Sequence, residues 1–156
     1  MSRSGAGAAV VILLSAATSL AQAPNAPSPR LANVSGLKCV FAVQATGTWK
    51  GGEPDASVKP AKLSVAFNAV DTQEGTAEAV GDAGKSHITV RLLGSYLHLM
   101  QLDPYGALYV TTVMDTETRG GKLQAVHTRH EYTPVSLPGL TSRPEQYYGE
   151  CQIVAR

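Results

Sequence analysis

The sequence predicts an all-β fold, an antiparallel meander of about eight strands that closes, or nearly closes, into a barrel. Three observations favour this fold class. Short runs alternate apolar and polar residues with the period of a half-buried strand. Glycine- and proline-containing turns separate these runs. Beyond the N-terminal segment, no apolar run has the 3.6-residue period of a helix. A β-sandwich of the same strands is the alternative.

An export signal precedes this domain. Arg3 is followed by the apolar run 8–14 and by the small-residue site Ala21-Gln22-Ala23, the order of features found in secretory signal peptides. The run is too short and too interrupted for a membrane span, which needs about 20 apolar residues. We therefore expect cleavage after Ala23, no membrane span after processing, and a secreted or periplasmic protein.

The processed chain divides into two parts. Residues 24–36 contain three prolines and no apolar periodicity, which predicts a disordered, proline-rich leader. Residues 37–156 have a length that suits a single β domain.

The first two strands have clear alternation. The first, residues 37–50, places these side chains on one face: Leu37, Cys39, Phe41, Val43, Ala45 and Trp49. A turn is expected at residues 51–55, where glycine and proline are concentrated. The second strand, residues 62–70, places these on one face: Leu63, Val65, Phe67 and Ala69.

Six further strands follow. A weaker run at residues 75–80 precedes a hairpin in which Gly94-Ser95 joins residues 87–93 to residues 96–102. The remaining strands are expected at residues 107–114, 122–132 and 146–154. The connection at 133–145 is the longest in the chain; it either folds over a barrel mouth as a lid or simply covers an open end.

The two cysteines, Cys39 and Cys151, predict a disulfide, because an even count in an exported chain is typical of an oxidising compartment. A metal pair and two free thiols are the alternatives, but Cys-x-x-Cys spacing is missing and no histidine stands within four residues of either cysteine. A bridge from the first strand to the last makes these strands neighbours. It therefore favours the barrel over the sandwich.

The charge balance argues against nucleic-acid binding. Loss of Arg3 with the signal peptide would bring the 13 Lys and Arg residues level with the 12 Asp and Glu residues. Proteins that bind nucleic acids carry an excess of basic residues or a stripe of them on the surface, so we expect no nucleic-acid partner.

The densest polar cluster is the segment 125–131. On a strand, His127, Arg129 and Glu131 share one face, whereas His130 lies on the other. The two histidines therefore diverge, and we assign no metal site. If His127 and Arg129 face the interior, Arg129 needs a carboxylate partner or a bound anion, because an unpaired buried charge is costly. We favour the simpler interpretation, a solvated face with an Arg129–Glu131 contact.

Two resemblances accompany these patterns. Gly47-Thr48-Trp49 resembles the G-x-W element of lipocalins and avidin-like proteins, which implies an eight-stranded barrel that holds a small ligand; the simpler interpretation is a lone tryptophan at the floor of a β-core. Residues 111–113, 125–131 and 146–151 together resemble a group of uncharacterised exported bacterial β-domain proteins over residues 96–152. That second resemblance implies no activity.

These observations predict an exported, non-enzymatic binding or interaction module with a small-ligand cavity. The expected binding residues are Trp49, His127, Arg129 and Tyr147, and the expected ligand is small and either apolar or anionic. No cofactor and no catalytic residue is assigned. The alternative hypothesis is an enzyme that uses His127 or His130 as general acid or base.

Overall fold

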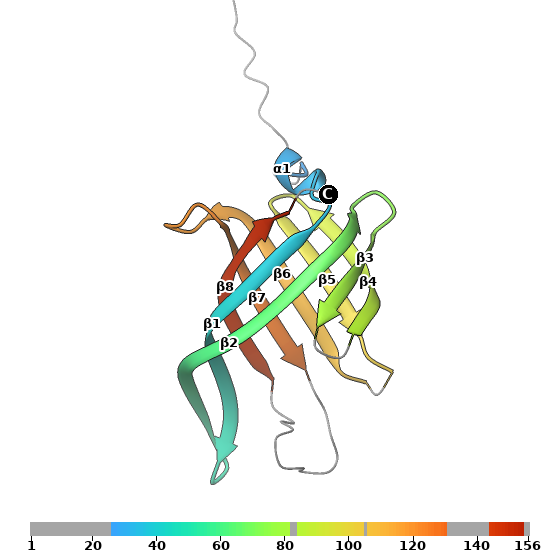
Figure 1. The fold of residues 1–156 in the computed structure, drawn as a ribbon. Helices are drawn as coiled ribbons and strands as arrows, with labels where there is room; N and C mark the ends of the chain where they lie inside the picture. The colour runs from blue at the N-terminus through green and yellow to red at the C-terminus, as the bar shows by residue number, and fades with distance from the viewer. Residues whose placement is uncertain (1–25, 82–83, 105, 131–143, 155–156) are drawn as a thin grey trace, which may run out of the picture.

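The fold is an eight-stranded antiparallel barrel, described by a computed structural model for residues 26–81, 84–104, 106–130 and 144–154 (Figure 1). Each strand pairs with the next along the chain, and the first pairs with the last. The strands are β1 Leu37–Lys50, β2 Glu53–Asp71, β3 Thr76–Gly81, β4 Gly84–Leu93, β5 Tyr96–Leu102, β6 Leu108–Glu117, β7 Leu123–His130 and β8 Glu145–Ile153. The predicted all-β meander is confirmed. The predicted signal peptide lies outside the described residues.

The barrel is closed by antiparallel pairing of β1 with β8. Leu37 lies opposite Ile153 at one end of this pair of strands, and Thr46 lies opposite Glu145 at the other. Cys39 and Cys151 are directly opposed between them and form the predicted disulfide. Both cysteines face the interior and are fully buried. The bridge therefore joins the two strands that complete the barrel.

Apolar side chains fill most of the barrel interior, and the short helix α1, Pro29–Ala32, covers one end (Figure 1). The main interior residues are Leu37, Phe41, Phe67, Val90, Leu97, Leu99, Val113 and Leu123. Leu31 and Val34 join this core with 0% and 3% of their surface exposed. In the described ranges, no helix is long and apolar enough to cross a membrane.

Hydrogen bonds and ion pairs hold α1 on the barrel. The Ser28 hydroxyl donates to the Asp115 carboxylate on β6, and Arg30 donates to both Asp115 and Glu117 at 2.6 Å. The expectation of a disordered leader over 24–36 is therefore wrong for its described part. Apolar Leu31 and two anchoring polar side chains order this segment, although it is too short to show any periodicity.

A bulge in β1 reverses the predicted alternation after Phe41. Phe41 pairs with Gly149 and Val43 pairs with Tyr148, so two residues of β1 oppose one step of β8. Gln44 is consequently buried, with 6% of its surface exposed, whereas Val43 is 38% exposed. The predicted inward positions of Val43 and Ala45 are thus wrong, because an extra residue moves every later side chain to the other face.

Two smaller corrections concern β2. Ala69 has a φ of 49° and lies at an irregularity in the β2–β3 pairing; as a result Val70, and not Ala69, faces the core. The turn expected at residues 51–55 is a tight turn at Gly51 and Gly52 alone, whose φ angles of 62° and 91° suit a type I′ hairpin. β2 therefore starts at Glu53.

Gly149→Ala should strongly destabilise the fold. A Cβ at this position would overlap the Val40 carbonyl oxygen and lie 2.6 Å from the Phe41 Cα, both of which belong to backbone that cannot rotate away. We expect a loss of about 3 kcal/mol in the free energy of unfolding, measured by denaturant titration.

Gly47→Ala is the matched control for this measurement, because nothing lies within 4 Å of a Cβ built on Gly47. It should change stability by no more than about 0.5 kcal/mol. Equal effects of the two substitutions would contradict the close approach of β1 and β8.

The double substitution Cys39→Ala/Cys151→Ala should lower the free energy of unfolding by about 4 to 5 kcal/mol. The bridge spans 112 residues, and its loss returns the corresponding loop-closure entropy to the unfolded chain. Guanidinium denaturation of the variant and of the oxidised protein measures the difference. An unchanged transition midpoint would show that strand pairing alone closes the barrel.

Candidate functional site

Polar side chains face the barrel interior at the end opposite α1, and we call this group the polar end. It consists of two cross-strand rows. The first row is Thr111, His127, Tyr147 and Gln44, and the second is Tyr109, Arg129, Glu145 and Thr46, from β6, β7, β8 and β1 respectively. The rows are adjacent because His127 and Arg129, like Tyr147 and Glu145, are two residues apart on their strands.

His127 is buried at the centre of the first row, with 7% of its surface exposed. Its Nδ1 lies 2.8 Å from the Thr111 hydroxyl, with which it shares a hydrogen bond. Three aromatic rings surround it: Phe41 at 5.6 Å, Tyr147 at 6.1 Å and Tyr109 at 6.3 Å between ring centroids. The Tyr109 and His127 rings are stacked, with 8° between their planes.

Burial, followed by the nearby positive charge of Arg129, lowers the pKa of His127 from 6.5 to about 4. The imidazole is therefore neutral at neutral pH. With so low a pKa, the imidazole is a weak general base.

The second row brings a cation and an anion into the interior. The Arg129 guanidinium lies over the Tyr109 ring, 5.4 Å from its centroid, which is the geometry of a cation–π contact. Glu145, the cross-strand neighbour of Arg129, is 6% exposed. Its Oε2 accepts a hydrogen bond of 2.6 Å from the Tyr147 hydroxyl. Burial, followed by this hydrogen bond, raises the pKa of Tyr147.

The solvated face that we favoured for this strand is therefore wrong, because His127 and Arg129 point into the barrel. The carboxylate across from Arg129 is that of Glu145 on β8. Glu131, the partner suggested by strand periodicity, lies outside the described residues, as does most of the predicted lid.

Three of the four predicted binding residues, His127, Arg129 and Tyr147, come together at the polar end. Only the backbone of Trp49 is described, and it pairs with Pro54 of β2. Trp49 lies three residues beyond Thr46, the last residue of β1 that pairs with β8. Trp49 and Pro54 therefore belong to a two-stranded extension of β1 and β2, residues 47–56, which we call the arm. The arm projects from the barrel at the end opposite α1 (Figure 1).

Sequence reasoning missed Gln44, Tyr109, Thr111 and Glu145. Gln44 alternates with the apolar face predicted for residues 37–50, and only the bulge in β1 turns it inward. Glu145 was assigned to the long connection, although it is the first residue of β8. The alternation of the last predicted strand could have found Glu145. If that strand is extended by one residue toward the N-terminus, Glu145 lies on the same face as Tyr147 and Cys151.

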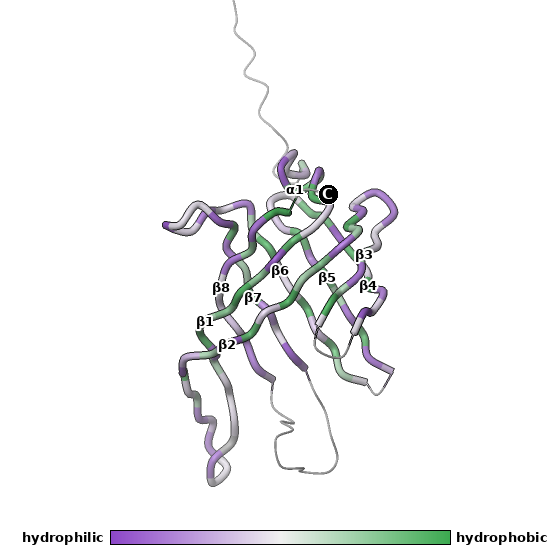
Figure 2. Tube along the Cα trace, viewed as in Figure 1, coloured by the Kyte–Doolittle hydropathy of each residue, from purple (hydrophilic) through white to green (hydrophobic). Residues whose placement is uncertain are grey.

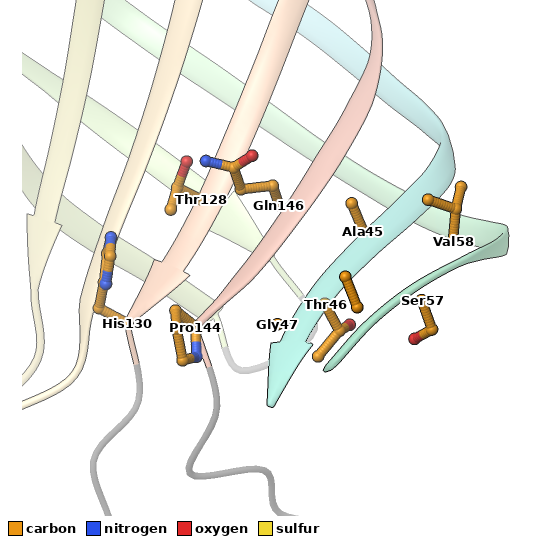
Figure 3. Close-up of a pocket in the computed structure, with 10 residues that line it drawn as sticks. Ala45, Thr46, Gly47, Ser57, Val58, Thr128, His130, Pro144 and Gln146 are labelled. Carbon is orange, nitrogen blue, oxygen red and sulfur yellow. The ribbon is translucent and has the colours of Figure 1, made fainter. Parts of the chain in front are cut away.

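A separate groove of about 280 Å³ lies on the outer surface of the same strands. Thr128 and Gln146 on β7 and β8 line one side, and residues 45–47 and 56–58 of β1 and β2 line the other (Figure 3). His130 also lines this groove and is exposed. The two histidines of the segment therefore lie on opposite faces of β7, and His127 does not reach the groove.

Among the residues that the structure describes, no group of three or more His, Cys, Asp or Glu side chains is arranged to hold a metal ion. No buried side-chain nitrogen or oxygen in these ranges lacks a hydrogen-bond partner. The polar end is thus internally satisfied, and a ligand that enters it must exchange an existing contact.

Comparison of the chain with protein-family models, with curated proteins and with solved structures finds no match.

The depressed pKa of His127 predicts that stability falls as pH is lowered from 7 to 5. The folded protein resists protonation until about pH 4, whereas the unfolded chain takes up the proton near pH 6.5. The unfolded state therefore binds more protons in this window, and the free energy of unfolding should decrease by about 2 kcal/mol. The charged or titratable groups that face His127 are Arg129, Tyr109, Tyr147 and Glu145.

Denaturant titration at pH 7, 6 and 5 measures this slope. His127→Gln should flatten it, whereas His87→Gln, at an exposed position on β4, should retain it. The assignment fails if both variants keep the slope of the unsubstituted protein.

Proposed function

We propose that this protein is an exported, non-enzymatic binding module that takes a small ligand with an anionic group at the polar end of its barrel. The observation that carries the proposal is the pair of polar rows inside the barrel, which places an arginine and a glutamate on the inner wall at one end only. These groups already pair with one another within the described residues, so a ligand would bind by replacing contacts such as that of Arg129 with the Tyr109 ring.

Arg129 is the group best suited to hold the ligand. It is the one permanent cation of the polar end, and its guanidinium already lies on the Tyr109 ring. A carboxylate or phosphate can pair with a guanidinium through two parallel hydrogen bonds. Such a pair is strong enough to replace the contacts that Arg129 makes in the unliganded protein, and a neutral polar group has no comparable advantage.

The aromatic side chains around Arg129 indicate the rest of the ligand. Tyr109, Tyr147 and Phe41 surround His127 immediately beside the guanidinium. A small apolar or aromatic body would pack against these rings while its anionic group contacts Arg129. The closed meander barrel is also the architecture that the G-x-W resemblance implied, and kinship with those ligand-binding families remains a prediction.

Export is supported by two independent features. The N-terminal segment has the order of a signal peptide, with the site Ala21-Gln22-Ala23. The Cys39–Cys151 bridge suits an oxidising compartment. We therefore place the binding module in the periplasm or outside the cell, after cleavage following Ala23.

Arg129→Ala should weaken binding of the best ligand by about tenfold or more, because the anionic group loses its ion pair. Small carboxylates and phosphates with aromatic or aliphatic bodies would be screened by thermal shift, and affinities of the hits would be measured by calorimetry. Arg119→Ala, at an exposed turn position, is the matched control and should bind normally. Failure of every anionic compound to bind, or equal affinity of the two variants, would refute the proposed site.

A further inference from the structure

Along more than half of its length, one edge of β2 pairs with no other strand. β3 pairs with β2 only from Ala66 to Asp71, whereas β1 pairs with β2 from Glu53 onward. Residues 53–65 of β2 therefore present a free edge within the described part of the chain. Residues 51–60 are exposed without exception, and the arm is coloured mostly pale to purple in Figure 2.

The hairpin geometry shows which backbone groups point from this edge. Gly51 and Gly52 form a two-residue turn, so its flanking residues, Lys50 and Glu53, are a hydrogen-bonded pair. Successive residues of a strand direct their N–H and C=O groups to opposite edges. Even-numbered residues from 54 to 60 consequently direct these groups away from β1, because the β1–β2 register is unbroken from Glu53 to Pro60.

Both prolines of this segment are among the residues whose backbone groups point away from β1. Pro54 and Pro60 are six residues apart and lack an N–H, so neither disturbs the pairing with β1. Between them, Ala56 and Val58 retain outward N–H and C=O groups. Prolines on an exposed edge usually protect it from uncontrolled strand addition. Here they leave a short pairing site with a defined beginning and end.

We propose that this edge is a self-association site, at which β2 of one copy pairs antiparallel with β2 of a second copy about a two-fold axis through Ser57. In this register Ala56 of each copy exchanges two hydrogen bonds with Val58 of the other. Pro54 of each copy then lies opposite Pro60 of the other. No edge N–H is left facing a proline, and all four available donors are bonded.

Charge complementarity selects a second copy as the partner. Asp55 and Lys59 lie on the same face of β2, two residues to either side of Ser57. The two-fold register therefore places Asp55 of each copy directly opposite Lys59 of the other, twice. These are non-hydrogen-bonded pairs, in which side chains approach most closely. Within the described part of the chain, neither side chain already forms an ion pair.

The contact is smaller than a standard protein interface, so we expect a dissociation constant on the order of 100 μM. Sedimentation velocity of the purified protein, from low micromolar to millimolar concentration, should show a monomer–dimer equilibrium without larger species. Val58→Pro, which removes an edge donor and leaves the β1 ladder intact, should abolish the dimer. Val58→Ala keeps the N–H and should preserve it.

A charge exchange tests the register. Asp55→Lys and Lys59→Asp should each weaken the dimer by about tenfold, and the double variant should restore it, because both opposite-charge pairs are re-formed with reversed sign. Glu74→Lys, at an exposed position in the β2–β3 turn, is the matched control and should leave the dimer unchanged.

Either of two results would overturn the proposal: a protein that stays monomeric at millimolar concentration, or a dimer that survives both single charge reversals. Both are independent of ligand binding at Arg129, which lies inside the barrel on β7. Failure of the dimer is therefore distinguishable from failure of the binding function.

Discussion

Pairing of β1 with β8 converts an open eight-stranded meander, which would expose two edges, into a barrel without terminal edges. Three features meet in this pair of strands: the buried Cys39–Cys151 bridge, the bulge after Phe41, and the contact of Gly149 with the backbone of β1. Gly149 has no side chain on the inner face at the point where the bulged strand bends toward it. The bulge can therefore form without separating the strands, and closure depends on a glycine there.

The bulge also changes the polarity of the side chains that β1 directs into the barrel. Before it, β1 directs Leu37, Cys39 and Phe41 into the apolar core. After it, the inward positions belong to Gln44 and Thr46, which continue the two polar rows of β6, β7 and β8. One extra residue thus lets β1 contribute polar side chains to an end of the barrel that β6, β7 and β8 already line with polar side chains.

Sequence patterns predicted the strands well because alternation is a local property, and they predicted closure because two cysteines marked the first and last strands. They failed where one residue changed the phase. Gln44 and Val70 face the core because of irregularities in strand pairing, which the amino-acid sequence does not reveal. Leu31 is buried through contacts with distant strands, which a proline-rich segment does not reveal. Within the candidate site, His127 and Arg129 were identified, but their cross-strand neighbours depend on register, and register is a property of the assembled sheet.

The closure of the barrel also has a consequence for how the chain folds. Residues 37–46 find their second partner only in residues 145–153, and α1 is anchored to Asp115 and Glu117 on β6. The first strand, β1, can therefore pair only with β2 until residues 145–153 are available to pair with its other edge. Contacts so distant in sequence raise the contact order and slow folding. If the chain is exported in extended form, in line with the proposed function, the barrel closes only after translocation, and the cysteines oxidise once their strands have met.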